Sequence, residues 1–95
     1  MATTTLATFV AVASTAGVQT LLAADATRQS VIISNNDANA LYVLIGGVGT
    51  VSSTNYSVII AATTGTFTIP AVLASEKITG IWAADGSGFA LITYK

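Results

Sequence analysis

Residues 28–45 read RQSVIISNNDANALYVLI, and this stretch decides the fold class. Two runs rich in β-branched residues, Arg28–Ser34 and Ala40–Ile45, flank the cluster NNDAN at residues 35–39. β-Branched side chains favour pleated, half-buried strands. Asn and Asp favour turns because their side chains hydrogen-bond to their own backbone. The stretch therefore predicts two strands joined by a turn, which we expect to pair as a β-hairpin.

The same alternation of apolar and polar residues continues through the chain, with no sustained helical period. DGSG at residues 85–88 predicts a second hairpin, between the last two strands. Pro70 should end a strand or lie at a sheet edge. Ala71–Ser75 predicts one helical turn. We expect a single all-β domain over residues 1–95, a β-sandwich or barrel of seven to eight mostly antiparallel strands. The predicted strands are Thr5–Val12, Val18–Ala23, Arg28–Ser34, Ala40–Ile45, Tyr56–Ala62, Thr66–Ile69, Lys77–Ala84 and Phe89–Tyr94.

The composition excludes several classes of chemistry. Only 7% of the residues are charged, against about 25% in ordinary domains. The absence of His and Cys excludes zinc fingers, Fe–S clusters, disulfides and Ser-His-Asp triads. Three basic residues beside four acidic ones do not make a polybasic surface for nucleic acid. We therefore expect no enzyme, no cofactor, no small-molecule substrate and no nucleic-acid partner.

The apolar N-terminal segment, MATTTLATFVAVASTAGVQTLLAADA at residues 1–26, superficially suggests a secretory signal. It lacks the Lys or Arg with which such signals begin. Thr, Ser and Gln also interrupt it too often for a membrane span of about 20 apolar residues. Residues 1–15 instead predict an edge strand or an arm that adds a strand to a neighbouring subunit. Its candidate interface residues are Leu6, Phe9 and Val10.

Three local motifs favour structural roles over chemical ones. The loop GGVGT at residues 46–50 lacks the Lys-Ser/Thr ending of a phosphate-binding loop, and no helix follows it. Asp37 and Asp85 lie in predicted turns, where Asp is common, and nothing in the sequence brings them together as a catalytic pair. The oxygens of Asn35, Asp37 and Asn39 lack the ligand spacing of an EF-hand. No metal site is therefore expected.

The aromatic residues leave two interpretations open. Their alternating positions in strands favour core packing, whereas an exposed Trp-Tyr platform would suit sugar stacking or a protein interface. Trp82 and Tyr94 lie on the two strands expected to form the last hairpin. We therefore take both as candidate interface residues.

Several segments together carry a resemblance to a known family. They are RQSVIISN at 28–35, LYV at 41–43 with Gly46-Gly47, SSTNYSV at 52–58, Ile69-Pro70, ITGIWAA at 78–84 with Gly86, and FALITY at 89–94. Over about two-thirds of its length the chain resembles small virion proteins of tailed bacteriophages. It departs at TFT, residues 66–68, where an acidic residue is expected, and in its apolar N-terminal extension. The resemblance implies a small β-structure on the phage head or neck, with no catalytic residues.

The resemblance and the composition together predict a capsid decoration (cement) protein. Low net charge promotes association, and the expected partners are the major capsid protein and further copies of this chain. A homotrimer would fit the local threefold positions of an icosahedral shell. The expected location is the surface of the phage head, after synthesis in the host cytoplasm and with no membrane contact. The alternatives are a neck, head-fibre or tail component, and a carbohydrate-binding module with at least two exposed aromatic residues on one face.

Overall fold

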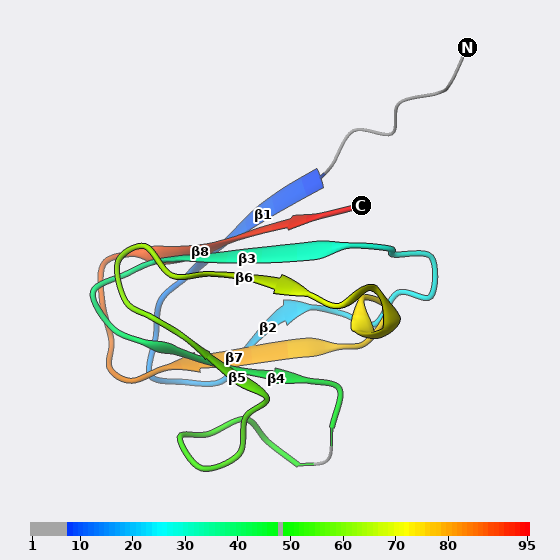
Figure 1. Cartoon of the computed structure of the whole chain (residues 1–95). Coiled ribbons are helices and arrows are strands. Elements are labelled where there is room, and N and C mark those ends of the chain that lie inside the picture. Colours follow the sequence, from blue (N-terminus) through cyan, green and yellow to red (C-terminus); the bar gives the residue numbers. More distant parts are fainter. Residues whose placement is uncertain (1–7, 48) are drawn as a thin grey trace.

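The chain folds back and forth between two stacked β-sheets (Figure 1). The computed structural model describes residues 8–47 and 49–95, which form eight antiparallel strands and one short 3-10 helix. The elements are β1 (Thr8–Ala13), β2 (Gln19–Leu22), β3 (Val31–Asn36), β4 (Leu41–Ile45), β5 (Val58–Ile60), β6 (Thr66–Ile69), η1 (Ala71–Leu73), β7 (Ile78–Trp82) and β8 (Phe89–Tyr94).

The strand order identifies the architecture. Sheet A has the order β1-β8-β3-β6 and sheet B the order β2-β7-β4-β5. Every pairing is antiparallel, and the chain crosses to the opposite sheet after every strand except β4. This interleaved order is that of a jelly roll, a sandwich built from two Greek keys. The predicted all-β sandwich is thereby confirmed.

Both predicted hairpins are wrong. β3 and β4, the strands on either side of residues 37–40, lie in different sheets. β7 and β8, on either side of residues 83–88, also lie in different sheets. The turns were located correctly, because Asn, Asp and Gly mark where the chain reverses. Turn composition does not specify whether the next strand pairs with the previous one or crosses to the facing sheet. Here both turns are crossings between the sheets.

Pro70 and the following residues behave as the sequence predicts. β6 ends at Ile69, directly before Pro70, whose missing N–H cannot continue the ladder. The expected helical turn is η1, a 3-10 turn. Within the described residues, no helix has the length and apolar character that crossing a membrane requires.

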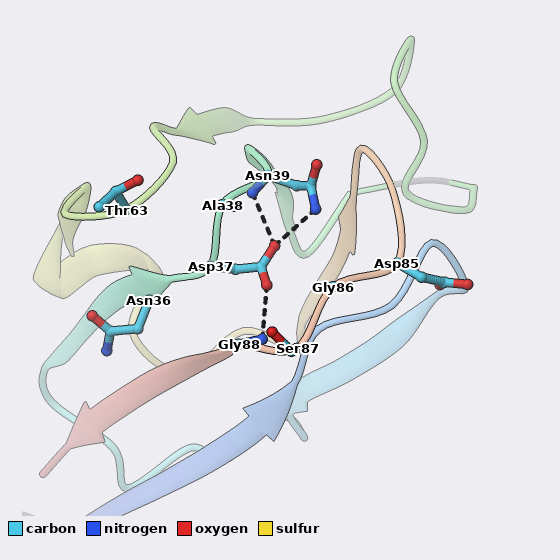
Figure 2. Close-up of a pocket in the computed structure, with 9 residues that line it drawn as sticks. All are labelled: Asn36, Asp37, Ala38, Asn39, Thr63, Asp85, Gly86, Ser87 and Gly88. Carbon is cyan, nitrogen blue, oxygen red and sulfur yellow. Dashed lines mark hydrogen bonds between the residues drawn. The ribbon is translucent and has the colours of Figure 1, made fainter.

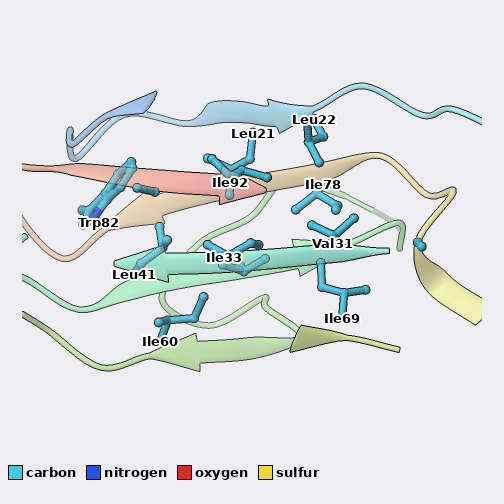
Figure 3. Close-up of a cluster of buried hydrophobic side chains, with 13 residues drawn as sticks. Leu21, Leu22, Val31, Ile33, Leu41, Ile60, Ile69, Ile78, Trp82 and Ile92 are labelled. Atoms are coloured by element: carbon cyan, nitrogen blue, oxygen red, sulfur yellow. The ribbon is translucent and has the colours of Figure 1, made fainter. Parts of the chain in front are cut away.

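The core lies between the two sheets and is filled almost entirely by aliphatic side chains (Figure 3). Alternation along β3 shows how the sequence fills it: Val31, Ile33 and Asn35 are buried, while Ile32 and Asn36 are exposed. The side chains of a strand point alternately to its two faces, so every second residue reaches the core. The cluster comprises Leu21, Leu22, Val31, Ile33, Leu41, Val43, Ile60, Ile69, Ala74, Ile78, Trp82, Ala90 and Ile92.

Candidate interaction surface on sheet A

The outer face of sheet A carries no charged side chain among the described residues. Residues directly opposite one another in antiparallel strands share a face, so the register places Phe9, Thr93, Ile32 and Thr68 in one row across all four strands. Neighbouring rows continue this surface, which we call the sheet A face. Its members are Phe9, Ala11, Ala13, Ile32, Ser34, Asn36, Thr66, Thr68, Phe89, Leu91 and Thr93.

Large apolar side chains on this face are open to solvent. Phe9 is 70% exposed, and Ile32 and Phe89 are each 40% exposed. Hydroxyl-bearing side chains, such as Thr66 and Thr68, occupy much of the remaining area. An extended apolar surface on a small protein is typical of a site that contacts another macromolecule.

The outer face of sheet B differs because the loop between β4 and β5 covers part of it. Leu44 follows the core residue Val43 and therefore points outward, yet only 7% of it is exposed. Val51, in the loop itself, is 1% exposed although it is outside the main core cluster. Tyr56 at the end of the loop packs on Tyr42, with ring centroids 5.3 Å apart. Sheet B thus has a cover from its own chain, whereas none of the residues that the structure describes covers the sheet A face in this way.

The sequence-based interface residues fall into different environments. Phe9 belongs to the sheet A face and is its most exposed large side chain. Val10 points to the inner side of β1 but is still 37% exposed. Leu6 lies outside the described residues. Of the predicted segment 1–15, residues 8–13 form the edge strand β1, paired with β8 of the same chain.

Trp82 is a core residue, in agreement with the core packing that its position in an alternating strand favoured. It is 1% exposed, and its indole Nε1 donates a hydrogen bond to Asn35 Oδ1 at 3.0 Å. Asn35 is fully buried, and its amide donates to the carbonyls of Asn39, Ile60 and Ala61. The pair links β3 of sheet A to β7 of sheet B. Trp82 therefore presents no side-chain surface to a partner.

Tyr94 is half-buried and packs against the core cluster. The guanidinium carbon of Arg28 lies 6.0 Å from the centre of its ring, at the outer limit of a cation–π contact. Arg28 is itself buried and donates three hydrogen bonds to backbone carbonyls, those of Ala23, Ala74 and Glu76. Tyr94 thus belongs to a structural cluster at one end of the sandwich. Sequence reasoning missed the role of Arg28, because a single Arg before a strand carries no signal of its partners.

An open pocket of about 480 Å³ lies at the opposite end of the sandwich (Figure 2). Asp37 and Asp85 both contribute to it, although nothing in the sequence had placed them together. Figure 2 shows the Asp85 side chain pointing away from Asp37. The pocket is lined by Asn36, Asp37, Ala38, Asn39, Thr63, Asp85, Gly86, Ser87 and Gly88.

The carboxylate of Asp37 is engaged by its own chain on both oxygens. Oδ1 accepts hydrogen bonds from Ser14 Oγ at 2.8 Å and the Gly88 N–H at 2.9 Å. Oδ2 accepts the backbone N–H of Asn39 at 2.9 Å and its side-chain amide at 3.1 Å. A Cβ on Gly88 would collide with Asp37 and with the Asn36 carbonyl, so this approach requires glycine. Asp37 thus ties three connections of the sandwich together.

These contacts lower the pKa of Asp37. The backbone N–H of Asn39 has the largest lowering effect, and Ser14 and Gly88 lower the pKa further, while burial opposes them. A carboxyl group held ionised in this way suits a structural acceptor better than a general acid. Among the described residues, no group of three or more His, Cys, Asp or Glu is placed to hold a metal ion.

No protein-family model, no curated protein and no solved structure matches this chain. The sheet A face is therefore the candidate site on grounds of geometry and chemistry. It extends across four strands without a charged side chain, and large apolar side chains on it are exposed in the described chain.

Proposed function

We propose that this protein is a structural component of a tailed-phage virion, a capsid decoration protein that binds the head through the sheet A face. The exposure of Phe9 and Ile32 on a face without charge is the observation that carries the proposal. Burying such a surface against another protein removes apolar area from water without desolvating a charge. The resemblance to phage virion proteins supplies the identity of the particle.

The fold and the composition support the same proposal. Jelly rolls build many viral capsid domains, and they also build lectins, so the fold alone does not select a function. None of the eight strands contains Asp, Glu, Lys or Arg, which suits packing against protein. A decoration protein bridging capsid subunits would stabilise the shell by burying at least about 1,000 Å² per contact. Many copies would add their effects through multivalency.

The major capsid protein is the proposed partner, together with further copies of this chain. The homotrimer stays a prediction, drawn from the local threefold positions of icosahedral shells. A neck, head-fibre or tail component is the alternative within the virion, and copy number separates the two. Hundreds of copies in a virion reconstruction support decoration, whereas a dozen or fewer contradict it.

The carbohydrate-binding alternative receives less support from the side chains. It predicted at least two aromatic residues exposed on one concave face, with Trp82 and Tyr94 as its main support. Trp82 lies in the core and Tyr94 is half-buried against Arg28. The exposed aromatic residues of sheet A are Phe9 and Phe89, which lie in different rows of the face. They have no polar group with which to orient a sugar.

A matched pair of variants tests the docking face. Ile32 and Ile59 point outward from sheets A and B and are 40% and 46% exposed. Ile32→Asp should weaken binding to undecorated heads at least tenfold, or about 1.4 kcal/mol, because it buries an unpaired charge in the contact. Ile59→Asp should leave binding within about twofold, because Ile59 points outward from sheet B and lies outside the proposed contact.

The same variants provide a functional measurement. Heads decorated with the wild-type protein or with Ile59→Asp should withstand a higher temperature than bare heads, whereas heads mixed with Ile32→Asp should fail at the temperature of bare heads. Equal failure temperatures for bare and wild-type-decorated heads would exclude the cement mechanism. Equal loss of binding in both variants would exclude the sheet A face as the contact.

A further inference from the structure

The four edge strands of the sandwich are not equally protected from pairing with another chain. β2 is irregular between Thr20 and Leu22. β5 has three residues, and β6 has four and ends before Pro70. Bulges, short edges and proline are the features by which proteins block edge-to-edge association. β1 has none of them: it has six residues and pairs with β8 in unbroken register.

β1 is also exposed on both of its faces. Phe9, on the sheet A face, is 70% exposed, and Val10, on the opposite side, is 37% exposed. Val10 lies in the same row as Ile92 and Ile33, which are fully buried. Figure 1 shows the N-terminal end of β1 lying away from sheet B. A long regular edge with apolar side chains on both faces is a template for another strand.

We propose that β1 pairs antiparallel with β1 of a second copy of this chain, so that sheet A continues across a twofold axis. The first charged residue of the sequence is Asp25, so no charged side chain lies on this strand. In a twofold contact the same strand supplies both sides. A charge on the axis would face its own kind, and a charge beside the axis would need an opposite charge on the same strand. An uncharged edge is therefore compatible with itself.

The alternation of the strand restricts the register of this contact. A twofold axis perpendicular to the sheet keeps the sheet A face on one side, so outward residues must lie opposite outward residues. Pairing Val10 with Val10 of the second copy satisfies this condition. It also places Phe9 opposite Ala11, so that the large side chain lies beside a small one. Both Phe9 and Ala11 belong to the sheet A face, which the dimer doubles in extent.

A single introduced cysteine tests the register, because the natural chain has none. Directly opposed residues in antiparallel strands have Cβ atoms about 4.5–5.5 Å apart, close enough for a disulfide after small adjustment. Val10→Cys should therefore give a disulfide-linked dimer under mild oxidation. Ile59→Cys, at the exposed edge of sheet B, is the matched control and should remain a single chain. Equal cross-linking of the two variants would overturn the proposed register.

The mass of the untagged protein in solution tests the contact itself. The wild-type protein should sediment as a dimer of about 19 kDa, twice the 9.5 kDa of one chain. Ala11→Lys places a charge on the outward side of β1 and should raise the dimer dissociation constant at least tenfold. Thr68→Lys places the same charge on β6, the other edge of sheet A, and should leave that constant unchanged. Circular dichroism should show that both variants remain folded.

Three results would overturn the proposal. A wild-type protein that is monomeric would mean that β1 does not pair with β1 of a second copy. The homotrimer expected from the threefold positions of the shell, found as the sole species, would require a contact without the twofold axis. A dimer that Thr68→Lys weakens as much as Ala11→Lys would place the contact elsewhere. The protein is measured alone, so failure of the dimer leaves the test of capsid binding unaffected.

Discussion

The two ends of the sandwich each bury one charged side chain, and the charges have opposite signs. At one end the carboxylate of Asp37 accepts hydrogen bonds from Ser14, Asn39 and Gly88. At the other end the guanidinium of Arg28 donates to three backbone carbonyls, those of Ala23, Ala74 and Glu76. In both cases the hydrogen-bonding partners are neutral groups, and some of them lie far away in the sequence: Ser14 and Gly88 for Asp37, Ala74 and Glu76 for Arg28.

This comparison shows how a chain with seven charged residues uses two of them. A carboxylate has only acceptors and a guanidinium only donors. Asp37 therefore collects N–H and O–H groups that turns leave unpaired, and Arg28 collects carbonyls. Charged groups make stronger hydrogen bonds than neutral ones, so each residue can hold several connections at once. The crossings that make the jelly roll are fixed at their ends by these contacts.

The largest expected effect is at the Arg28 end. Arg28→Ala leaves three carbonyls without their donor in a buried site, so the free energy of unfolding should fall by about 3–5 kcal/mol. Equilibrium unfolding in urea measures the change. Arg28→Lys should recover only part of the loss, because an ammonium cannot reproduce the planar fork of the guanidinium.

Lys77→Ala is the control for charge at that end of the molecule. Lys77 is exposed, and its removal should change the free energy of unfolding by no more than about 0.5 kcal/mol. A loss below about 1 kcal/mol in Arg28→Ala would show that the guanidinium contacts are dispensable, and the comparison between the ends would fail.

A smaller destabilisation is expected for Asp37→Asn, because the amide keeps one acceptor oxygen and the shape of the side chain. Its pH dependence is the distinguishing measurement. The folded state lowers the pKa of Asp37, so the stabilisation is present above about pH 4, the ordinary Asp value. It is lost as the pH falls through the lower folded-state pKa. The difference in unfolding free energy between wild type and variant should therefore be largest near neutral pH and decrease in acid.

Glu76→Gln removes an exposed carboxylate at the other end and serves as the matched control. A difference between wild type and Asp37→Asn that stays constant from pH 7 to pH 2 would mean that the charge of Asp37 does not stabilise the fold. The shape of the side chain alone would then explain the variant.

The smallest effect is expected at Thr63, beside the Asp37 end. Thr63 has a positive φ of 73° and donates its backbone N–H to the Asp37 carbonyl at 2.7 Å. This conformation is costly for a β-branched residue and easy for glycine. Thr63→Gly should therefore stabilise the protein by about 0.5–1 kcal/mol, after the entropy cost of glycine is subtracted. A thermal unfolding curve measures it.

Thr68→Gly, in the extended strand β6, should instead destabilise the protein, because glycine weakens a strand without relieving any strain. Equal destabilisation by both glycine variants would show that the positive φ of Thr63 carries no backbone strain.

The sequence predicted the positions of the strands better than the way in which the strands are connected and paired. Alternation located all eight strands to within a few residues, and Thr66–Ile69 and Phe89–Tyr94 match their predicted bounds. The alternation extends beyond the predicted strand Arg28–Ser34, as far as Asn35. The cluster NNDAN was interpreted as a turn, but Asn35 continues the inward pattern of Val31 and Ile33 and forms a buried hydrogen bond to Trp82.

The candidate site was predicted only in part. Phe9 and Val10 were expected at an interface from the apolar N-terminal segment, and both are exposed on β1. Ile32 was missed, because an apolar residue between Val31 and Ile33 looks like part of a buried run. Only the pairing of β3 with β8 and β6 shows that Ile32 lies in an exposed row with Phe9.

By itself, the sequence determined where strands and turns occur to within a few residues, since both follow from the side chains of neighbouring residues. The predicted strands still included Arg28 and Lys77, which the structure places outside β3 and β7. Tertiary structure decided which sheet each strand joins, which strand is left as a regular open edge, and which polar residues are buried. The physical reason is that the alternation of apolar and polar residues specifies which face of a strand is buried. It does not specify which strands lie on either side of that strand in the sheet. Asp37, Arg28 and Trp82 acquire their roles only when connections distant in sequence meet at the ends and in the core of the sandwich.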